Sequence, residues 1–226
     1  MRHTSILLST CLAILSSATV AVRAEEGSDA FAKRLLAATS VDQKTYACFV
    51  RTYDKAHLAK HPRQKVTDMK LLVGAERLPE DAEVSYSFRV NVKLRTHKGE
   101  LESFSSCGHA EASENPKDGM SIHCGGECGG GGLNISPATG DKAVMLNLDD
   151  IGIWPVSKPE EASDLRLNAG RDDKVFRLDR VSNDICAAMI AQDKKDDETA
   201  KAATAEINEQ NKKDGEKAKA ETTPSN

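Results

Sequence analysis

Residues 84–95 read VSYSFRVNVKLR, and this stretch decides the fold class. Apolar side chains occupy every second position from Val84 to Leu94, and polar side chains fill the positions between them. Because successive side chains of a β-strand point to opposite faces, this period predicts an antiparallel strand with one face in the core and one in water. His97, Lys98 and Gly99 indicate a turn, so residues 101–107 are expected to return as the second strand of a hairpin.

Short segments rich in β-branched, aromatic and aliphatic residues lie on both sides of this hairpin. The connections between them are short, and none has the length of a helix that crosses between parallel strands. We therefore predict an all-β protein with minor α content, an antiparallel meander of about eight strands closed as a barrel or folded as a sandwich. Besides the hairpin, the predicted strands cover residues 44–53, 65–74, 120–124, 133–136, 143–153, 165–168 and 175–181.

Residues 1–24 have the three parts of a secretory signal peptide. Arg2 lies in a short polar start, an apolar run covers residues 6–15, and Val22 and Ala24 suit a cleavage site after Ala24. We expect the cleaved chain to be periplasmic or secreted, without a transmembrane segment, because no second long apolar run follows. A lipid anchor on Cys11 is the alternative, although its flanking residues only loosely resemble a lipobox.

The rest of the chain divides into three predicted parts. Residues 25–43 are expected to form a flexible leader whose short helix attaches loosely. Residues 44–192 form the β-rich domain, which ends in a short helix capped by Ser182. Residues 193–226 are predicted to be a disordered charged tail, because Ile207 is their one large apolar residue and such a segment buries too little surface to become ordered.

The charge balance argues against two classes of partner. The formal net charge is −4, and removal of the predicted signal peptide, which holds two arginines and no acid, changes it to −6. A mildly acidic protein has no electrostatic attraction for nucleic acid or for an anionic membrane. The expected partners are therefore a small ligand or a protein of the cell envelope.

The cleaved chain keeps five cysteines, and export to an oxidising compartment favours disulfides between them. We predict one bridge between Cys48 and Cys186, which would join the first strand to the last helix. We predict a second bridge between Cys107 and either Cys124 or Cys128.

A metal site is the alternative interpretation of the second group of cysteines. Cys107, His109, His123, Cys124 and Cys128 lie close together in the sequence, and zinc binds thiolates and imidazoles. Structural zinc sites favour two cysteines separated by two residues, whereas three residues separate Cys124 and Cys128. Zinc is the one cofactor that the sequence suggests, and no cofactor is expected if the disulfide forms.

Two other polar groups have weaker patterns. His57 and His61 would share one face of a helix, but Pro62 follows directly and predicts a loop. Asp172 and Asp173 lie in a turn sequence and are expected to be solvated.

Two stretches carry a resemblance to other proteins. Residues 48–54, CFVRTYD, and residues 124–131, CGGECGGG, resemble segments of uncharacterised exported bacterial proteins. The resemblance covers residues 44–190. It implies an exported β domain and brings with it no activity, cofactor or ligand.

No catalytic motif is present in the sequence, which contains no Gly-x-Ser-x-Gly element. The predicted function is an exported, non-catalytic binding or envelope-associated module, with a small apolar ligand in the interior or at the edge of the meander. The alternative is a periplasmic metal-binding or thiol-redox protein that uses the cysteine- and histidine-rich glycine loop. An enzyme of another type is a third possibility.

Overall fold

A computed structural model describes residues 29–77, 83–110, 120–125, 131–157 and 165–221. The predicted signal peptide and Cys128 therefore lie outside the described residues. The main elements are β1 (Thr45–Thr52), β2 (Val66–Arg77), β3 (Val84–Leu94), β4 (Leu101–His109), β5 (Ile122–Cys124), β6 (Leu133–Pro137), β7 (Ala143–Leu148) and β11 (Val175–Val181), with helices α2 (Lys55–Lys60) and α3 (Ala187–Glu221).

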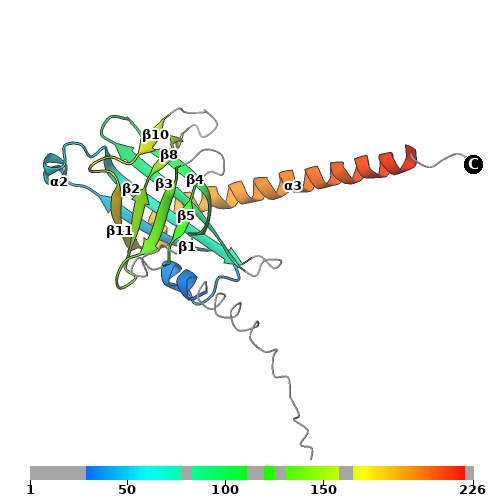
Figure 1. Ribbon diagram of the computed structural model, residues 1–226, viewed down its shortest axis with the longest axis horizontal. Helices are drawn as coiled ribbons and strands as arrows, with labels where there is room; N and C mark the ends of the chain where they lie inside the picture. The colour runs from blue at the N-terminus through cyan, green and yellow to red at the C-terminus, as the bar shows by residue number, and fades with distance from the viewer. Residues whose placement is uncertain (1–28, 78–82, 111–119, 126–130, 158–164, 222–226) are drawn as a thin grey trace, which may run out of the picture.

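These eight strands form a closed antiparallel barrel (Figure 1). Each of them pairs with the next along the chain, and β11 closes the barrel by pairing with β1, with Cys48 opposite Val181. The predicted hairpin is confirmed, because β3 pairs with β4 from Tyr86 and Cys107 to Val92 and Leu101. The meander is therefore a barrel, which was one of the two predicted forms.

Three short strands are inserted between β7 and β11. They are β8 (Asp150–Gly152), β9 (Trp154–Pro155) and β10 (Arg166–Asn168). β8 and β10 form a separate two-stranded sheet, and β9 pairs with the beginning of β4.

Apolar side chains fill the inside of the barrel. The alternation along each strand directs one set of residues inward, and these residues pack as one cluster. A fully buried Val, Leu, Ile or Phe contributes roughly 1.5–3 kcal/mol, so this cluster is the main source of stability. Its members, each at most 2% exposed, include Ala47, Phe49, Leu71, Val73, Phe88, Val90, Leu101, Ile122, Ile135, Leu146, Phe176 and Leu178.

A helix over residues 29–36 is part of this core (Figure 1). Phe31 and Leu35 are buried, and the Phe31 ring lies 6.0 Å from the ring of Tyr86. Arg180 donates hydrogen bonds to the carbonyl oxygens of Arg34 and Leu35, which satisfies groups at the end of the helix. The expectation of a loosely attached helix is therefore wrong, because its apolar face packs into the barrel's core.

The C-terminal helix α3 lies against the outside of the barrel and then projects away from it (Figure 1). A 3-10 turn over Asn183–Cys186 precedes it, and Ser182 caps that turn as predicted. Cys186 and Met189 pack on Tyr46, Cys48 and Leu72, which point outward from β1 and β2. In the described part of the chain, no helix has both the length and the apolar character needed to cross a membrane.

Helix α3 extends beyond the predicted end of the domain at residue 192. It continues to Glu221, and its residues Asp193, Asp196 and Asp197 form ion pairs with the barrel. The difference has a physical cause, since alanine, glutamate, lysine and glutamine all favour helix. Pairs four residues apart, such as Glu209 with Lys213 at 2.6 Å, add to this preference.

Two disulfides are present among the described cysteines. Cys48 bonds to Cys186, as predicted, and Cys107 bonds to Cys124, which was one of the two predicted choices. The first bridge joins residues 138 apart and the second joins residues 17 apart.

The two bridges are expected to contribute unequally to stability. In the chain-entropy model, the longer loop gives the larger effect, by about 2 kcal/mol. The double variant Cys48→Ala/Cys186→Ala should therefore unfold at a lower urea concentration than Cys107→Ala/Cys124→Ala, with the free energies taken from the midpoints and slopes. Equal losses in the two variants would contradict this ranking.

Candidate functional site

The cysteine- and histidine-rich segment forms a disulfide instead of a set of metal ligands. Cys107 and Cys124 lie directly opposite each other on β4 and β5 and are bonded together. His109 is two residues from Cys107 on β4, so it shares that face of the sheet, and its ring contacts the ring of Phe31. His123 is adjacent to Cys124 and points to the other face, where its Nδ1 lies 3.2 Å from Asn134 Oδ1.

These positions do not assemble the predicted zinc ligands. Two of the three sulfur atoms are used in a covalent bond, and the two imidazoles lie on opposite faces of the sheet. Within the described ranges, no group of three or more histidine, cysteine or acidic side chains is placed to hold a metal ion. The third cysteine of the predicted set, Cys128, is outside those ranges.

One concave surface lies between the beginning of α3 and the outer wall of the barrel, and we call it the α3 groove. Its volume is about 270 Å³. Buried charges form its floor, and exposed apolar side chains, Val156 and Ile185, lie at its edge. The remaining lining residues are Lys70, Arg89, Asn91, Glu100, Glu102, Ala188, Met189 and Gln192.

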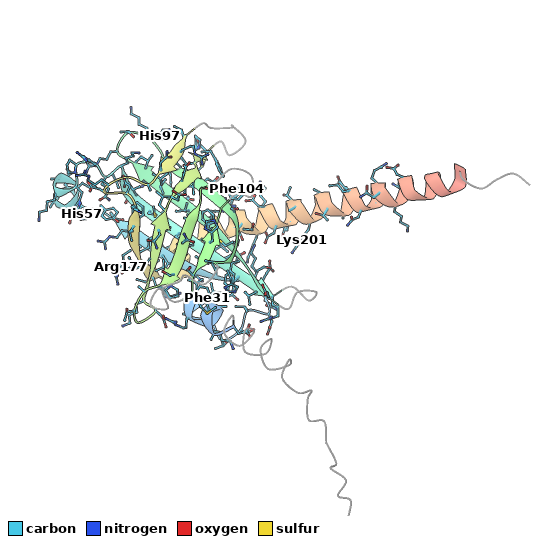
Figure 2. All side chains as sticks on the ribbon, in the orientation of Figure 1. Phe31, His57, His97, Phe104, Arg177 and Lys201 are labelled. Carbon is cyan, nitrogen blue, oxygen red and sulfur yellow. A yellow bond between two sulfur atoms is a disulfide. The ribbon has the colours of Figure 1, made fainter. Side chains whose placement is uncertain are left out.

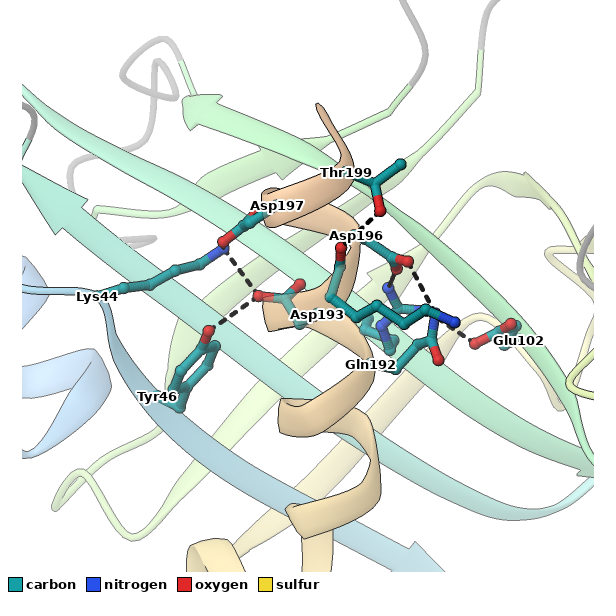
Figure 3. Close-up of polar contacts among 10 residues, drawn as sticks. Lys44, Tyr46, Glu102, Gln192, Asp193, Asp196, Asp197 and Thr199 are labelled. Atoms are coloured by element: carbon teal, nitrogen blue, oxygen red, sulfur yellow. Dashed lines mark hydrogen bonds and ion pairs between the residues drawn. The ribbon is translucent and has the colours of Figure 1, made fainter. Parts of the chain in front are cut away.

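The cations of the α3 groove are already paired with acids, and Figure 3 labels two of these acids, Glu102 and Asp196. Arg89 is 2% exposed, and its guanidinium pairs with Glu102 at 2.9 Å and with Asp196 of α3. It also lies 4.3 Å from the centre of the Phe104 ring. Lys70 pairs with Glu100 at 3.2 Å. Each cation of the groove therefore has at least one acid beside it.

A second group of polar contacts, made by Asp193 and Asp197, also holds α3 against the barrel (Figure 3). The ammonium group of Lys44 lies 2.8 Å from Asp193 and also pairs with Asp197, and the Tyr46 hydroxyl donates to Asp193 at 3.1 Å. Burial and the neighbouring Asp193 raise the pKa of Tyr46 above its usual range. Burial opposes the charged form of Lys44, but the two carboxylates outweigh it and raise its pKa.

The other concave surface lies near one end of the barrel, and we call it the cationic hollow. It has a volume of about 490 Å³ and is formed by the end of β1, helix α2 and the segment that leads into β11. Figure 2 labels His57 and Arg177, which reach the same side of the molecule from these distant parts of the chain. The lining residues are Arg51, Tyr53, His57, His61, Gln64, Arg171, Asp172, Lys174, Val175 and Arg177.

Helix α2 forms where the sequence predicted a loop. Asp54 caps it, because its Oδ1 accepts a hydrogen bond of 2.7 Å from the backbone N–H of His57. Pro62 lies beyond the last helical residue, Lys60, so it does not interrupt the helix. The expectation of a loop is therefore wrong: the cap starts the turn, and the proline only limits its length.

Three aromatic rings and one guanidinium group are stacked along one side of the cationic hollow. The Tyr53 ring lies 4.6 Å from that of His57, and the His57 ring lies 4.3 Å from that of His61. Arg51 lies 5.1 Å from the centre of the Tyr53 ring. Burial raises the pKa of Tyr53, although Arg51 opposes this, so its hydroxyl remains neutral near pH 7.

Gln64 orients the first imidazole of this stack. Its Nε2 donates to the carbonyl oxygen of Val66 at 2.9 Å, which leaves its Oε1 as an acceptor for His57 Nε2 at 3.0 Å. The His57 Nε2 must therefore carry a proton. Because Gln64 is buried, this contact holds the ring in a fixed orientation.

Asp173 holds the segment that carries the other cations. It is fully buried and accepts hydrogen bonds from the backbone N–H groups of Lys65 at 2.6 Å and Val66 at 3.2 Å. The expectation that Asp173 is solvated is wrong, because Val66, the first residue of β2, and Lys65 directly before it supply two donors that compensate for its burial. Arg171 and Lys174 are thereby placed beside α2.

The cationic hollow has an excess of positive charge. Arg51, Arg171, Lys174 and Arg177 line it, and Asp172 is the one carboxylate among the lining residues. Asp179 lies outside the hollow and pairs with both Arg51, at 3.6 Å, and Arg177. Within the described part of the chain, the side chains of Arg171 and Lys174 have no acidic partner.

The buried Arg89–Glu102 pair leads to a prediction for the α3 groove. Arg89→Met should lower the free energy of unfolding by roughly 3–5 kcal/mol, because Glu102 is left charged and buried. Arg89→Met/Glu102→Leu should recover much of this loss, since neither charge then remains. Urea unfolding measures both variants, and a double variant no more stable than the single one would show that the buried charge is not the cause.

The contacts of Lys44 and Tyr46 predict how stability depends on pH. Both groups have a raised pKa in the folded chain, so their contribution is complete below their unfolded values near pH 10 and is lost as the pH rises further. The melting temperature should therefore change little up to about pH 10 and fall as the pH rises from about 10 to about 12. Tyr46→Phe should show a smaller fall over this interval, because it removes one of the two groups, and an unchanged fall would exclude a contribution from Tyr46.

Comparisons with family models, curated proteins and solved structures found no match to this chain. The two concave surfaces and the positions of their charges are the features of the described chain that bear on function. Of the two, the cationic hollow has cations without an acidic partner among the described residues, whereas both cations that line the α3 groove are paired with acids.

Proposed function

We propose that this chain is an exported, non-catalytic binding module that holds a small ligand in the cationic hollow. The observation that carries the proposal is the hollow itself, in which Arg171 and Lys174 lack acidic partners among the described residues and lie beside a fixed stack of rings. Exposed cations and oriented aromatic rings are groups that bind ligands through charge and surface contact.

Export is the part of the proposal that rests on the sequence and on the disulfides. Residues 1–24 have the pattern of a signal peptide, and two disulfides agree with folding in an oxidising compartment. The proposed location is therefore the periplasm or the outside of the cell.

Binding without catalysis is proposed because of the groups that line the cationic hollow. Among these lining residues there is no serine, cysteine or threonine that a histidine could activate as a nucleophile. The single carboxylate, Asp172, accepts a hydrogen bond from the backbone N–H of Arg63 at 3.3 Å. These groups can hold and orient a ligand.

The proposed site differs from the sequence-based hypothesis, which placed a small apolar ligand in the interior or at the edge of the meander. The inward-facing side chains are packed together, whereas the cationic hollow is open to solvent and most of its lining residues are polar or charged. The alternative of a metal-binding protein would require the thiolates of Cys107 and Cys124, which are bonded to each other.

A pair of matched variants tests the proposed site. Val175 lines the cationic hollow and Val156 lines the α3 groove, and both side chains are exposed. Val175→Trp should obstruct the hollow, whereas Val156→Trp adds the same bulk elsewhere.

The measurement is native mass spectrometry of the exported protein after incubation with the small-molecule fraction of a bacterial periplasmic extract. Wild type and Val156→Trp should retain a bound small molecule, and Val175→Trp should lose most of it. The proposal is wrong if wild type retains nothing, or if Val175→Trp retains as much as wild type.

A further inference from the structure

We infer that the ligand of the cationic hollow is a small organic anion with two or more negative charges, held through carboxylate or phosphate groups. This inference rests on the proposed function, because it names the class of ligand for the same site. It is carried by the number, type and position of the charged side chains that line the hollow.

The charges are unbalanced in favour of an anion. Four lining residues carry a positive charge and one, Asp172, carries a negative charge. Even if Asp179 is counted against Arg51 and Arg177, which it contacts, the hollow keeps a net positive charge of two. A ligand with two negative charges would match this excess.

The side chains are also of the type that recognises oxyanions. Arginine presents a planar set of N–H donors that fits a carboxylate or a phosphate with two parallel hydrogen bonds. Arg171, Lys174 and Arg177 all line the hollow, and the two arginines flank Lys174 in the sequence. The ammonium group of Lys174 adds a compact point charge. An anion at this position would receive several charged donors without competition from a described acidic partner of Arg171 or Lys174.

Part of the cationic hollow is held in place before a ligand arrives. Gln64 fixes His57, the stack fixes the His57 and His61 rings relative to Tyr53, and Asp173 ties the segment of Arg171 and Lys174 to β2. A site that is already ordered loses less conformational entropy on binding. Asp173 therefore fixes the backbone from which the exposed side chains of Arg171 and Lys174 extend.

The size of the hollow and the net charge of the whole chain further define the class of ligand. A volume of about 490 Å³ lies within the range of sites for small organic molecules, so an anion with a carbon body is a better match than an inorganic ion alone. The chain has a net charge of −4, so its overall field repels long polyanions. The attraction is therefore local, which favours a small ligand over nucleic acid or an anionic membrane surface.

Calorimetric titration with defined probes tests this inference. Citrate supplies carboxylates, glycerol 3-phosphate supplies a phosphate, and glycerol is the uncharged comparison. Citrate or glycerol 3-phosphate should bind to the full exported chain at low salt, and glycerol should not. The stronger of the two anions identifies whether carboxylate or phosphate is preferred.

Two double variants, each of which removes two positive charges, test whether the cations of the hollow bind the anion. Arg171→Ala/Lys174→Ala removes two cations of the hollow, and Lys201→Ala/Lys212→Ala removes two exposed cations of α3. Since one charged contact changes affinity by about tenfold or more, the first pair should weaken anion binding at least tenfold and the second should change it little. Figure 2 labels Lys201, which lies on the projecting helix.

The outcomes separate this inference from the proposed function. It is overturned if neither anion binds, or if Arg171→Ala/Lys174→Ala binds the anions as wild type does. A different result is that wild type retains an uncharged molecule in the mass-spectrometry experiment and that Val175→Trp abolishes this retention. In that case the hollow binds another class of ligand, and only the inference of an anionic ligand is wrong. If Val175→Trp has no effect there, the binding function is wrong as well.

Discussion

The pairing of β11 with β1 is the constraint on which the rest of the structure depends. It joins the first and last strands of the barrel, which begin at Thr45 and Val175, and it turns the meander into a barrel without free edges. Because the two strands are antiparallel, the end of β1 lies beside the beginning of β11. Helix α2 follows β1 and the segment with Arg171 and Lys174 precedes β11, so closure of the barrel also creates the cationic hollow.

Part of the outer face of the barrel is apolar, and the beginning of α3 covers it. Tyr46, Cys48 and Leu72 point away from the interior, yet they are buried because the first turns of α3 lie on them. Beyond these apolar contacts, the attachment becomes ionic, through Lys44 and Arg89. The disulfide between Cys48 and Cys186 lies where the chain enters the helix, so it fixes the position from which all of these contacts form.

The sequence predicted those features that depend on local pattern. Alternation identified the strands and the hairpin, and the expected oxidising compartment together with a small number of cysteines led to the bridges that the structure contains. The proline at position 62 predicts a loop in place of helix α2, but the cap at Asp54 starts the helical turn before the proline can limit it. The cationic hollow could not be predicted, because its two halves lie near opposite ends of the domain's sequence and meet only through barrel closure.

A barrel whose interior is filled with side chains leaves no space there for a ligand. In an eight-stranded barrel the inner space is just wide enough for side chains, and here Phe49, Phe88 and Phe176 are among those that occupy it. The ends and the outer wall then remain for recognition, and they differ in electrostatics. The outer wall neutralises Arg89 with Glu102 and Asp196, whereas the end near α2 leaves Arg171 and Lys174 without an acid among the described residues. In a chain of net negative charge, unmatched cations at a fixed concave position are the feature most readily explained by an anionic ligand.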